Sequence, residues 1–185
     1  MMFEAQTEWI APDSFPDLSG YKLIAIDLET RDPDLKSKGS GAVIGNGEII
    51  GVAVAVDGWC KYYPFGHEGG GNLDKKRVLE WVKDVCATEA TKIFHNAMYD
   101  VCWLRSYGIK INGHIMDTMV MASLVNENRM RYTLNALSWE YLGERKSEAT
   151  LFEIAKNWGI DPKAELYKLP AIYVGEYAEK DASLT

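Results

Sequence analysis

The amino-acid sequence predicts an α/β protein in which a mixed β-sheet is flanked by α-helices. Three observations lead to this fold class. Apolar runs of strand length fill the first third of the chain, and Asp57-Gly58, a strong hairpin signal, joins two of them. From residue 74 onward, segments with helical spacing of apolar residues alternate with short apolar strands. A chain of 185 residues also suits one domain with a substantial core.

The first part of the chain is expected to hold three strands. Residues 1–20 are expected to form an extended lead-in, because they show little periodicity. Four glycines interrupt residues 31–47, which are therefore expected to form a loop. The segment GHEGGGN, residues 66–72, is expected to be a flexible turn. The expected strands are Tyr21–Leu28, Glu48–Val56 and Trp59–Phe65.

The second part is expected to hold helices separated by two short strands, one at Lys92–Phe94 and one just before Asp117. Glycine suits the end of a helix and proline suits its first turn, which sets several of the expected boundaries. Residues 146–169 show a mixed pattern without a clear period. The expected helices are Asp74–Ala87 with Asp74 as N-cap, Ala97–Tyr107 ended by Gly108, a helix opened by Asp117 or Thr118, Thr133–Leu142 ended by Gly143, and Pro170–Thr185.

The composition is that of an ordinary globular protein, with 47% hydrophobic and 25% charged residues. No apolar run is long enough to cross a membrane, and the N-terminus lacks a secretory signal pattern. Three cysteines without a C-x-x-C pair indicate a reducing, intracellular compartment. The net charge of −7 excludes nucleic-acid binding through a basic surface, unless clustered carboxylates hold cations that invert the local charge.

The run IAIDLET, residues 24–30, ends an expected strand with two carboxylates one residue apart. Side chains at i and i+2 of a strand point to the same face, so Asp27 and Glu29 are expected to lie together. The carboxyl ends of strands in an open α/β sheet are also where ligands bind. Taken alone, this pair would equally suit a solvated strand end.

Two later segments place polar groups on helix faces. In HNAMYD, residues 95–100, Asn96 and Asp100 are four residues apart and share a face. Asp100 stands among apolar neighbours, where a carboxylate needs a partner, whereas Asn96 alone suits an N-cap. In EYAEKDA, residues 176–182, Tyr177 and Asp181 also share a helix face.

In this order, the three segments resemble the motifs of the DEDD 3′–5′ exonucleases. D-x-E on the first strand, N-x-x-x-D on a middle helix and Y-x-x-x-D on a late helix match the tyrosine subgroup, and Glu176 stands where the histidine subgroup has its histidine. Residues 21–185 are most similar to the proofreading exonuclease domain of phage and bacterial family A DNA polymerases. The resemblance implies an RNase H-like fold and two divalent metal ions, Mg²⁺ or Mn²⁺.

The resemblance also implies a role for each matched residue. Asp27 would bridge the two metals. Glu29 and Asp181 would complete the site of the metal that activates water, and Asp100 would hold the metal that stabilises the leaving oxygen. Tyr177 would hydrogen-bond the attacking water and orient it. The candidate substrate-binding residues are Leu28, Thr30, Asn96 and Tyr99.

Elementary electrostatics agrees with a metal site. Four carboxylates that converge repel one another, and some stay protonated unless a cation joins them. Mg²⁺ and Mn²⁺ prefer oxygen ligands, and two such ions about 4 Å apart can clamp the attacking and leaving oxygens of a phosphodiester displacement. Tyrosine, with an ordinary pKa of about 10, is neutral at pH 7 and is a poor general base.

Other polar residues have simpler interpretations. Asp117 suits a helix cap better than a fifth acidic ligand. His67 is expected in a surface turn and His95 at the end of a strand. Tyr99 could stack a frayed base, but its helical spacing favours core packing. Four basic residues near expected helix ends could contact phosphates, although such residues more often form a solvated surface: Arg129, Arg131, Arg145 and Lys146.

The expected function is hydrolysis of a single-stranded or frayed 3′ end of DNA, with release of nucleoside 5′-monophosphates, in a bacterial or phage-infected cytoplasm. Two alternatives stay open: an exoribonuclease resembling RNase D, and a non-catalytic module that positions DNA for a partner domain. The last helix continues to the final residue, four beyond Asp181. This suggests a proofreading domain cut from a longer chain, with a polymerase domain as its partner, although a free-standing nuclease is an alternative.

Overall fold

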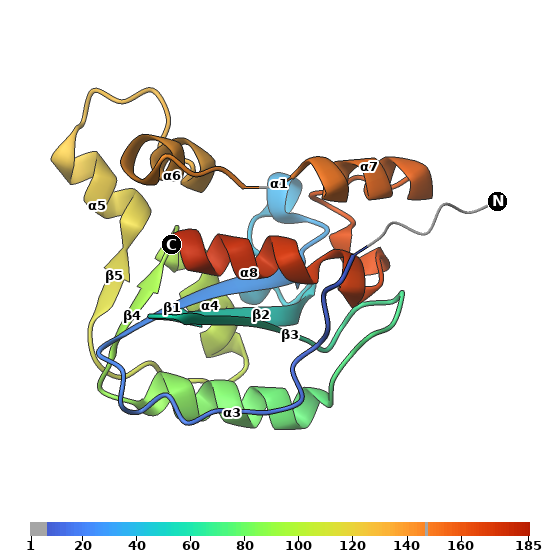
Figure 1. The fold of residues 1–185 in the computed structure, drawn as a ribbon, viewed down its shortest axis with the longest axis horizontal. Coiled ribbons are helices and arrows are strands. Elements are labelled where there is room, and N and C mark those ends of the chain that lie inside the picture. Colours follow the sequence, from blue (N-terminus) through green and yellow to red (C-terminus); the bar gives the residue numbers. More distant parts are fainter. Residues whose placement is uncertain (1–6, 147) are drawn as a thin grey trace.

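A computed structural model describes residues 7–146 and 148–185 and confirms the predicted mixed sheet (Figure 1). The strands are Leu23–Arg31 (β1), Glu48–Val56 (β2), Trp59–Pro64 (β3), Thr91–Phe94 (β4) and Ile115–Asp117 (β5). They form one sheet in the order β3-β2-β1-β4-β5. The hairpin strands β2 and β3 are antiparallel to each other, and β2 is antiparallel to β1, whereas β4 is parallel to both β1 and β5.

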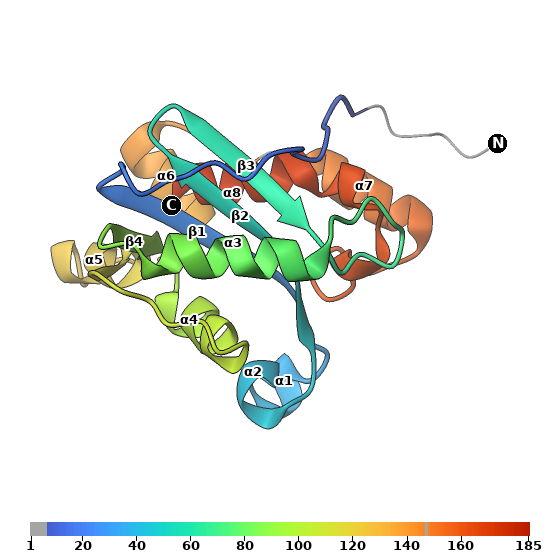
Figure 2. The ribbon, with the colours of Figure 1, turned by 90° about the horizontal axis from the view of Figure 1, so that it is seen from below.

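Helices cover both faces of this sheet. Figure 2 shows α3 (Lys75–Ala87) and α4 (Ala97–Ser106) on one side, and Figure 1 shows α8 (Gly175–Leu184) across the other. The remaining helical segments are α1 (Leu35–Lys38), α2 (Gly41–Ile44), α5 (Thr118–Val125), α6 (Leu134–Leu142), α7 (Ala149–Trp158) and the 3₁₀ turns η1 (Leu166–Lys168) and η2 (Ala171–Tyr173).

Side-chain alternation along β1 divides the core between the two faces. Ile24, Ile26 and Leu28 belong to the cluster that includes buried residues of α3 and α4. Ala25 belongs to the cluster that includes α7 and α8. Because residues two apart in a strand share a face, Asp27 and Glu29 point with Ala25 toward α8.

Glu179 fixes α8 over the sheet. Its Oε1 accepts a hydrogen bond from Trp9 Nε1 at 2.9 Å and another from the backbone N–H of Tyr62 in β3 at 3.1 Å. The Trp9 ring also covers the first residue of α8, where a Cβ added at Gly175 would lie 2.0 Å from the indole. The helix α8 is therefore held by both the sheet and the N-terminal segment.

Most expected elements are confirmed, with four local differences. The strand expected at Tyr21–Leu28 begins at Leu23 and extends to Arg31. The loop expected at 31–47 contains α1 and α2, and the mixed region 146–169 contains α7. The last helix begins at Gly175 instead of Pro170, because Pro170 has an extended backbone (φ −55°, ψ 140°) that precedes the turn η2.

The lead-in expected for residues 1–20 lies partly outside the described residues, which begin at residue 7. From there to residue 22 the chain has neither helix nor strand. It is nonetheless packed, since Trp9 and Leu18 are buried. This segment is an integral part of the described structure.

The expectation that His67 lies in a surface turn was wrong, because its side chain is only 3% exposed. Burial lowers the pKa of His67 to about 4, so the ring is neutral at pH 7. Nδ1 lies 2.9 Å from the carbonyl oxygen of Leu169 and donates to it, which leaves Nε2 to accept from the Tyr62 hydroxyl at 2.7 Å. His67 thus joins β3 to the segment that leads into α8.

Candidate active site

Three carboxyl groups from distant parts of the chain meet on the α8 side of β1. Asp27 and Glu29 come from β1 and Asp181 from α8, and one oxygen of each lies within 4.8 Å of the other two. Asp181 is buried, and its Oδ1 has no hydrogen-bond partner among the described residues. An unpartnered buried carboxylate oxygen is costly, so this oxygen-only donor set fits a divalent cation.

The electrostatics of the three groups also favour a bound cation. Burial, followed by the charge of Asp181, raises the pKa of Asp27 to about 7. Burial and then the charge of Asp27 raise the pKa of Glu29 well above its ordinary value. Burial likewise raises the pKa of Asp181, although the nearby Lys146 opposes that effect. Without a cation, the cluster therefore tends to retain protons.

Asp100 lies beside this cluster rather than within it. It sits in the first turn of α4 and is only 4% exposed. Burial and then the charge of Asp27 raise its pKa, whereas backbone hydrogen bonds from Leu28 and from Asp100 itself lower it. Its closest electrostatic partner in the site is therefore Asp27, the residue that the sequence motif predicted to bridge two metals.

Tyr177 lies one turn before Asp181 on α8, as the Y-x-x-x-D spacing predicted. Its pKa is raised far above the ordinary value, first by burial and then by the charges of Glu29 and Asp181. The phenol is therefore neutral at pH 7 and can act only as a hydrogen-bonding group.

Lys146 is a member of the site that the sequence did not predict. Its Nζ forms an ion pair with Asp181 Oδ2 and lies 5.2 Å from the centre of the Tyr177 ring. The lysine side chain is only 13% exposed, so the solvated-surface interpretation was wrong. Lys146 lies in the irregular connection between α6 and α7, where no periodic pattern could indicate its direction.

Comparison with known proteins identifies the family. Residues 4–185 match the family model described as 3′–5′ exonuclease. The chain belongs to this 3′–5′ exonuclease family. The exonuclease is 37% identical to a DNA-directed DNA polymerase of Pseudomonas phage M6, over 96% of this chain and 28% of that protein. It is 28% identical to the DNA polymerase DpoZ of Salmonella phage PMBT28, over 92% and 26% respectively. The chain thus spans just over a quarter of these polymerases.

Solved structures with the same fold include nucleases and a polymerase. Brucella melitensis NrnC with bound Mg²⁺ superposes with a TM-score of 0.56 at 19% identity, over 90% of this chain and 69% of that one. The Aedes aegypti Nibbler EXO domain gives 0.58 at 14% identity, over 90% and 75%. Pol1 of M. smegmatis gives 0.51 at 19% identity, over 80% and 24%. The RNase H-like fold is thereby confirmed, and the family makes the chain a metal-dependent 3′–5′ exonuclease.

Both carboxylate oxygens of Asp117 in the exonuclease accept hydrogen bonds from backbone N–H groups. Its carboxylate accepts hydrogen bonds from the N–H groups that begin two helices, α4 and α5, at distances from 2.8 to 3.3 Å. The donors are Asn96, Ala97, Met119 and Val120. The prediction that Asp117 caps a helix is confirmed, and the structure extends it to a second helix.

The four candidate substrate-binding residues of the exonuclease differ in accessibility. The Leu28 side chain is buried in the core, so only its backbone can face a substrate. Asn96 is exposed at a left-handed position (φ 70°) before α4, and its side chain makes no capping hydrogen bond. The hydroxyls of Thr30 and Tyr99 lie 2.7 Å apart, and Tyr99 also donates to Asp32 at 3.0 Å. Thr30 and Tyr99 are therefore fixed relative to β1.

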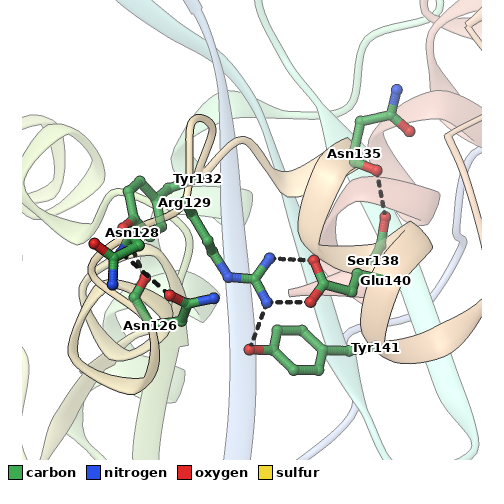
Figure 3. Close-up of polar contacts among 8 residues, drawn as sticks. All are labelled: Asn126, Asn128, Arg129, Tyr132, Asn135, Ser138, Glu140 and Tyr141. Atoms are coloured by element: carbon green, nitrogen blue, oxygen red, sulfur yellow. Dashed lines mark hydrogen bonds and ion pairs between the residues drawn. The ribbon is translucent and has the colours of Figure 1, made fainter.

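The other basic residues proposed for phosphate contact are mostly engaged within the exonuclease. Figure 3 shows the Arg129 guanidinium held between Glu140 and Tyr141 of α6, with a hydrogen bond of 2.9 Å to the tyrosine hydroxyl. Arg145 stacks on the Trp139 ring at 4.2 Å. Arg131 is exposed.

In the described part of the chain, no helix has the length and apolar character needed to traverse a bilayer.

Proposed function

We propose that this exonuclease removes nucleotides from a single-stranded or frayed 3′ end of DNA and so proofreads for a family A phage polymerase. The observation that carries the proposal is the meeting of Asp27, Glu29 and Asp181, where one buried oxygen has no hydrogen-bond partner among the described residues. The polymerase homologues support a polymerase domain in the same or a partner chain. Their phage origin supports the cytoplasm of an infected bacterium as the compartment.

Two divalent cations, Mg²⁺ or Mn²⁺, fit the donor set. Asp27 would contribute to both sites, Glu29 and Asp181 to one, and Asp100 to the other, in keeping with its position beside Asp27. When bound, such a pair of cations supplies a nucleophile from water at neutral pH and neutralises the charge on the leaving oxygen. The chain supplies the rigid strand and helix that keep these oxygens in place.

The remaining residues would position the reactants. Tyr177, neutral because its pKa is raised, would orient the attacking water through its hydroxyl without removing its proton. The terminal nucleotide would be held by the exposed Asn96 side chain and by the linked hydroxyls of Thr30 and Tyr99. Thr30 directly follows Glu29 in the sequence, and Tyr99 directly precedes Asp100. Hydrolysis then releases a nucleoside 5′-monophosphate and a chain shortened by one nucleotide.

A cleavage assay with single-stranded DNA tests this proposal. The wild-type protein with Mg²⁺ is expected to shorten a 5′-labelled oligonucleotide stepwise from its 3′ end, and EDTA is expected to abolish the reaction. Asp27→Ala should lower the rate by at least roughly 10²–10³-fold, the scale for losing one group that stabilises transition-state charge. Asp84→Ala, an exposed carboxylate on α3, is the matched control and should cleave like wild type. Undiminished cleavage by Asp27→Ala would contradict the site.

RNA of the same sequence provides the decisive second arm. One structure of the similarly folded Brucella melitensis NrnC is bound to pGG, which makes short oligonucleotides a relevant substrate class. Faster digestion of RNA than of DNA would favour the exoribonuclease alternative. Binding of DNA without cleavage of either polymer would favour a positioning module.

A further inference from the structure

Among the paired lysines in the described part of the chain, Lys146 stands apart because most of its side chain is covered where it meets the carboxylate cluster. In the ion pair between Lys146 and Asp181 the side chains are 13% and 6% exposed. The pair between Lys180 and Glu144 provides a contrast one residue away on α8, since its side chains are 36% and 54% exposed. An exposed pair contributes little to stability, whereas a buried cation strongly affects the charges around it.

The charge of Lys146 acts on all three carboxylates of the cluster. Its ammonium group pairs with Asp181 Oδ2, and one oxygen of Asp181 lies within 4.8 Å of an oxygen of Asp27 and of an oxygen of Glu29. One ammonium group therefore offsets part of the repulsion among three acids. Asp181 Oδ1 has no partner within residues 7–146 and 148–185, so the cluster remains short of positive charge.

We infer that Lys146 is a resident counter-ion that holds the carboxylate cluster together without divalent cations and competes with them for Asp181. This inference rests on the proposed function only in assigning Asp181 as a metal ligand. The ammonium group already occupies Asp181 Oδ2, one of the two oxygens that a cation at this carboxylate would use. The long flexible stem of lysine and its place in a connection between helices allow the ammonium to withdraw when a cation arrives.

Lys146 would then have two effects, one in the metal-free protein and one on cation binding. In the metal-free protein, Lys146 limits the repulsion that would otherwise separate α8 from β1. When cations bind, displacement of the lysine opposes binding, so Lys146 sets how much free cation the site needs. A residue that only packed against Tyr177 would stabilise the metal-free and the metal-bound protein equally and would not change the cation affinity.

Metal titration without nucleic acid tests the inference directly. Calorimetric titration of Lys146→Met with Mn²⁺ is expected to show a dissociation constant about tenfold lower than that of wild type, the scale for removing one like charge a few ångströms away. Melting in EDTA should occur at a lower temperature for Lys146→Met, and the rise in melting temperature on adding Mn²⁺ should be larger. Lys146→Gln serves as a second neutral variant if Lys146→Met folds poorly.

Two further variants complete the design. Lys146→Arg keeps the charge and should bind Mn²⁺ within about twofold of wild type. Lys180→Met removes the exposed lysine next to Asp181 and should leave both Mn²⁺ affinity and the EDTA melting temperature unchanged.

Unchanged or weaker Mn²⁺ binding in both neutral variants would overturn the inference. An equal loss of melting temperature with and without Mn²⁺ would also overturn it, because that result indicates packing alone. Failure of the proposed exonuclease is separable, since it would leave tighter Mn²⁺ binding by Lys146→Met intact while DNA stayed uncut by wild type.

Discussion

Lys92, which is buried, and the Asp27–Glu29–Asp181 cluster, which is partly buried, are two charged sites near opposite ends of the paired strands β1 and β4. The Lys92 ammonium donates to Ala90 O at 3.0 Å and Asn112 O at 3.1 Å, and to the hydroxyl and carbonyl of Thr88. Its side chain is fully buried. The acidic cluster, by contrast, has one lysine for three carboxylates and one oxygen without a partner.

The difference shows how to separate structural charges from ligand sites in this fold. The backbone supplies almost every partner of Lys92, so that charge is complete once the chain is folded. The described chain supplies one cation, Lys146, for the three carboxylates and no partner for Asp181 Oδ1, so their charge is balanced only with an added cation. Asp117 is an acidic example of a charge that the chain itself completes, since four backbone N–H groups donate hydrogen bonds to its carboxylate.

The largest expected effect separates activity from stability in the acidic cluster. Glu29→Gln should lower DNA cleavage by at least roughly 10²-fold, because it removes a charged ligand. The same change should raise the stability of the metal-free protein at pH 8 by about 1 kcal/mol, because it relieves repulsion among carboxylates that lie close together. Cleavage rates and thermal unfolding in EDTA check both effects. A less stable metal-free variant would show that the folded chain already compensates the charge of the carboxylate cluster, as it does for Lys92.

At the Lys92 site the expectation is reversed. Lys92→Met should lower the free energy of unfolding by about 3 kcal/mol, because it leaves buried carbonyl oxygens without donors. Mn²⁺ affinity and the cleavage rate per folded molecule should not change. Lys83→Met, an exposed lysine on α3, is the control for chemical denaturation. Loss of Mn²⁺ affinity in Lys92→Met would break the separation between the two sites.

The smallest expected effect concerns His67, which is buried and fully partnered but neutral. Because its pKa is about 4 in the folded protein and about 6.5 when unfolded, the unfolded chain binds the proton first as the pH falls. The folded protein should lose about 2 kcal/mol from this group between pH 7 and pH 4.5. Urea unfolding across this range should show a shallower loss for His67→Gln. Equal losses would mean that His67 does not limit acid stability.

The sequence predicted much of the site because its residues lie on regular elements. The spacing of Asp27 and Glu29 fixes a shared strand face, and that of Tyr177 and Asp181 fixes a shared helix face. The approach of α8 to β1 depends on tertiary packing, and it entered the prediction only through resemblance to a family. Lys146 and His67 escaped prediction because irregular segments position them, so neither has a period that indicates its direction.

The limits of the fold prediction have similar causes. The helices α1 and α2 contain four residues each, too few to show a helical period. Proline is as compatible with the extended residue before a 3₁₀ turn as with the first turn of a helix. Pro170 alone therefore could not indicate where α8 begins.

The hydrogen bond between Trp9 and Glu179 has a practical consequence for anyone who shortens or transplants this nuclease. A cut at residue 21, just before β1, would look safe from the strand boundaries alone. It would remove the indole that shields Gly175 and would leave Glu179 with one fewer donor, two residues from Asp181. The smallest portable unit of this nuclease therefore begins ahead of Trp9, in a segment that contributes no strand to the sheet.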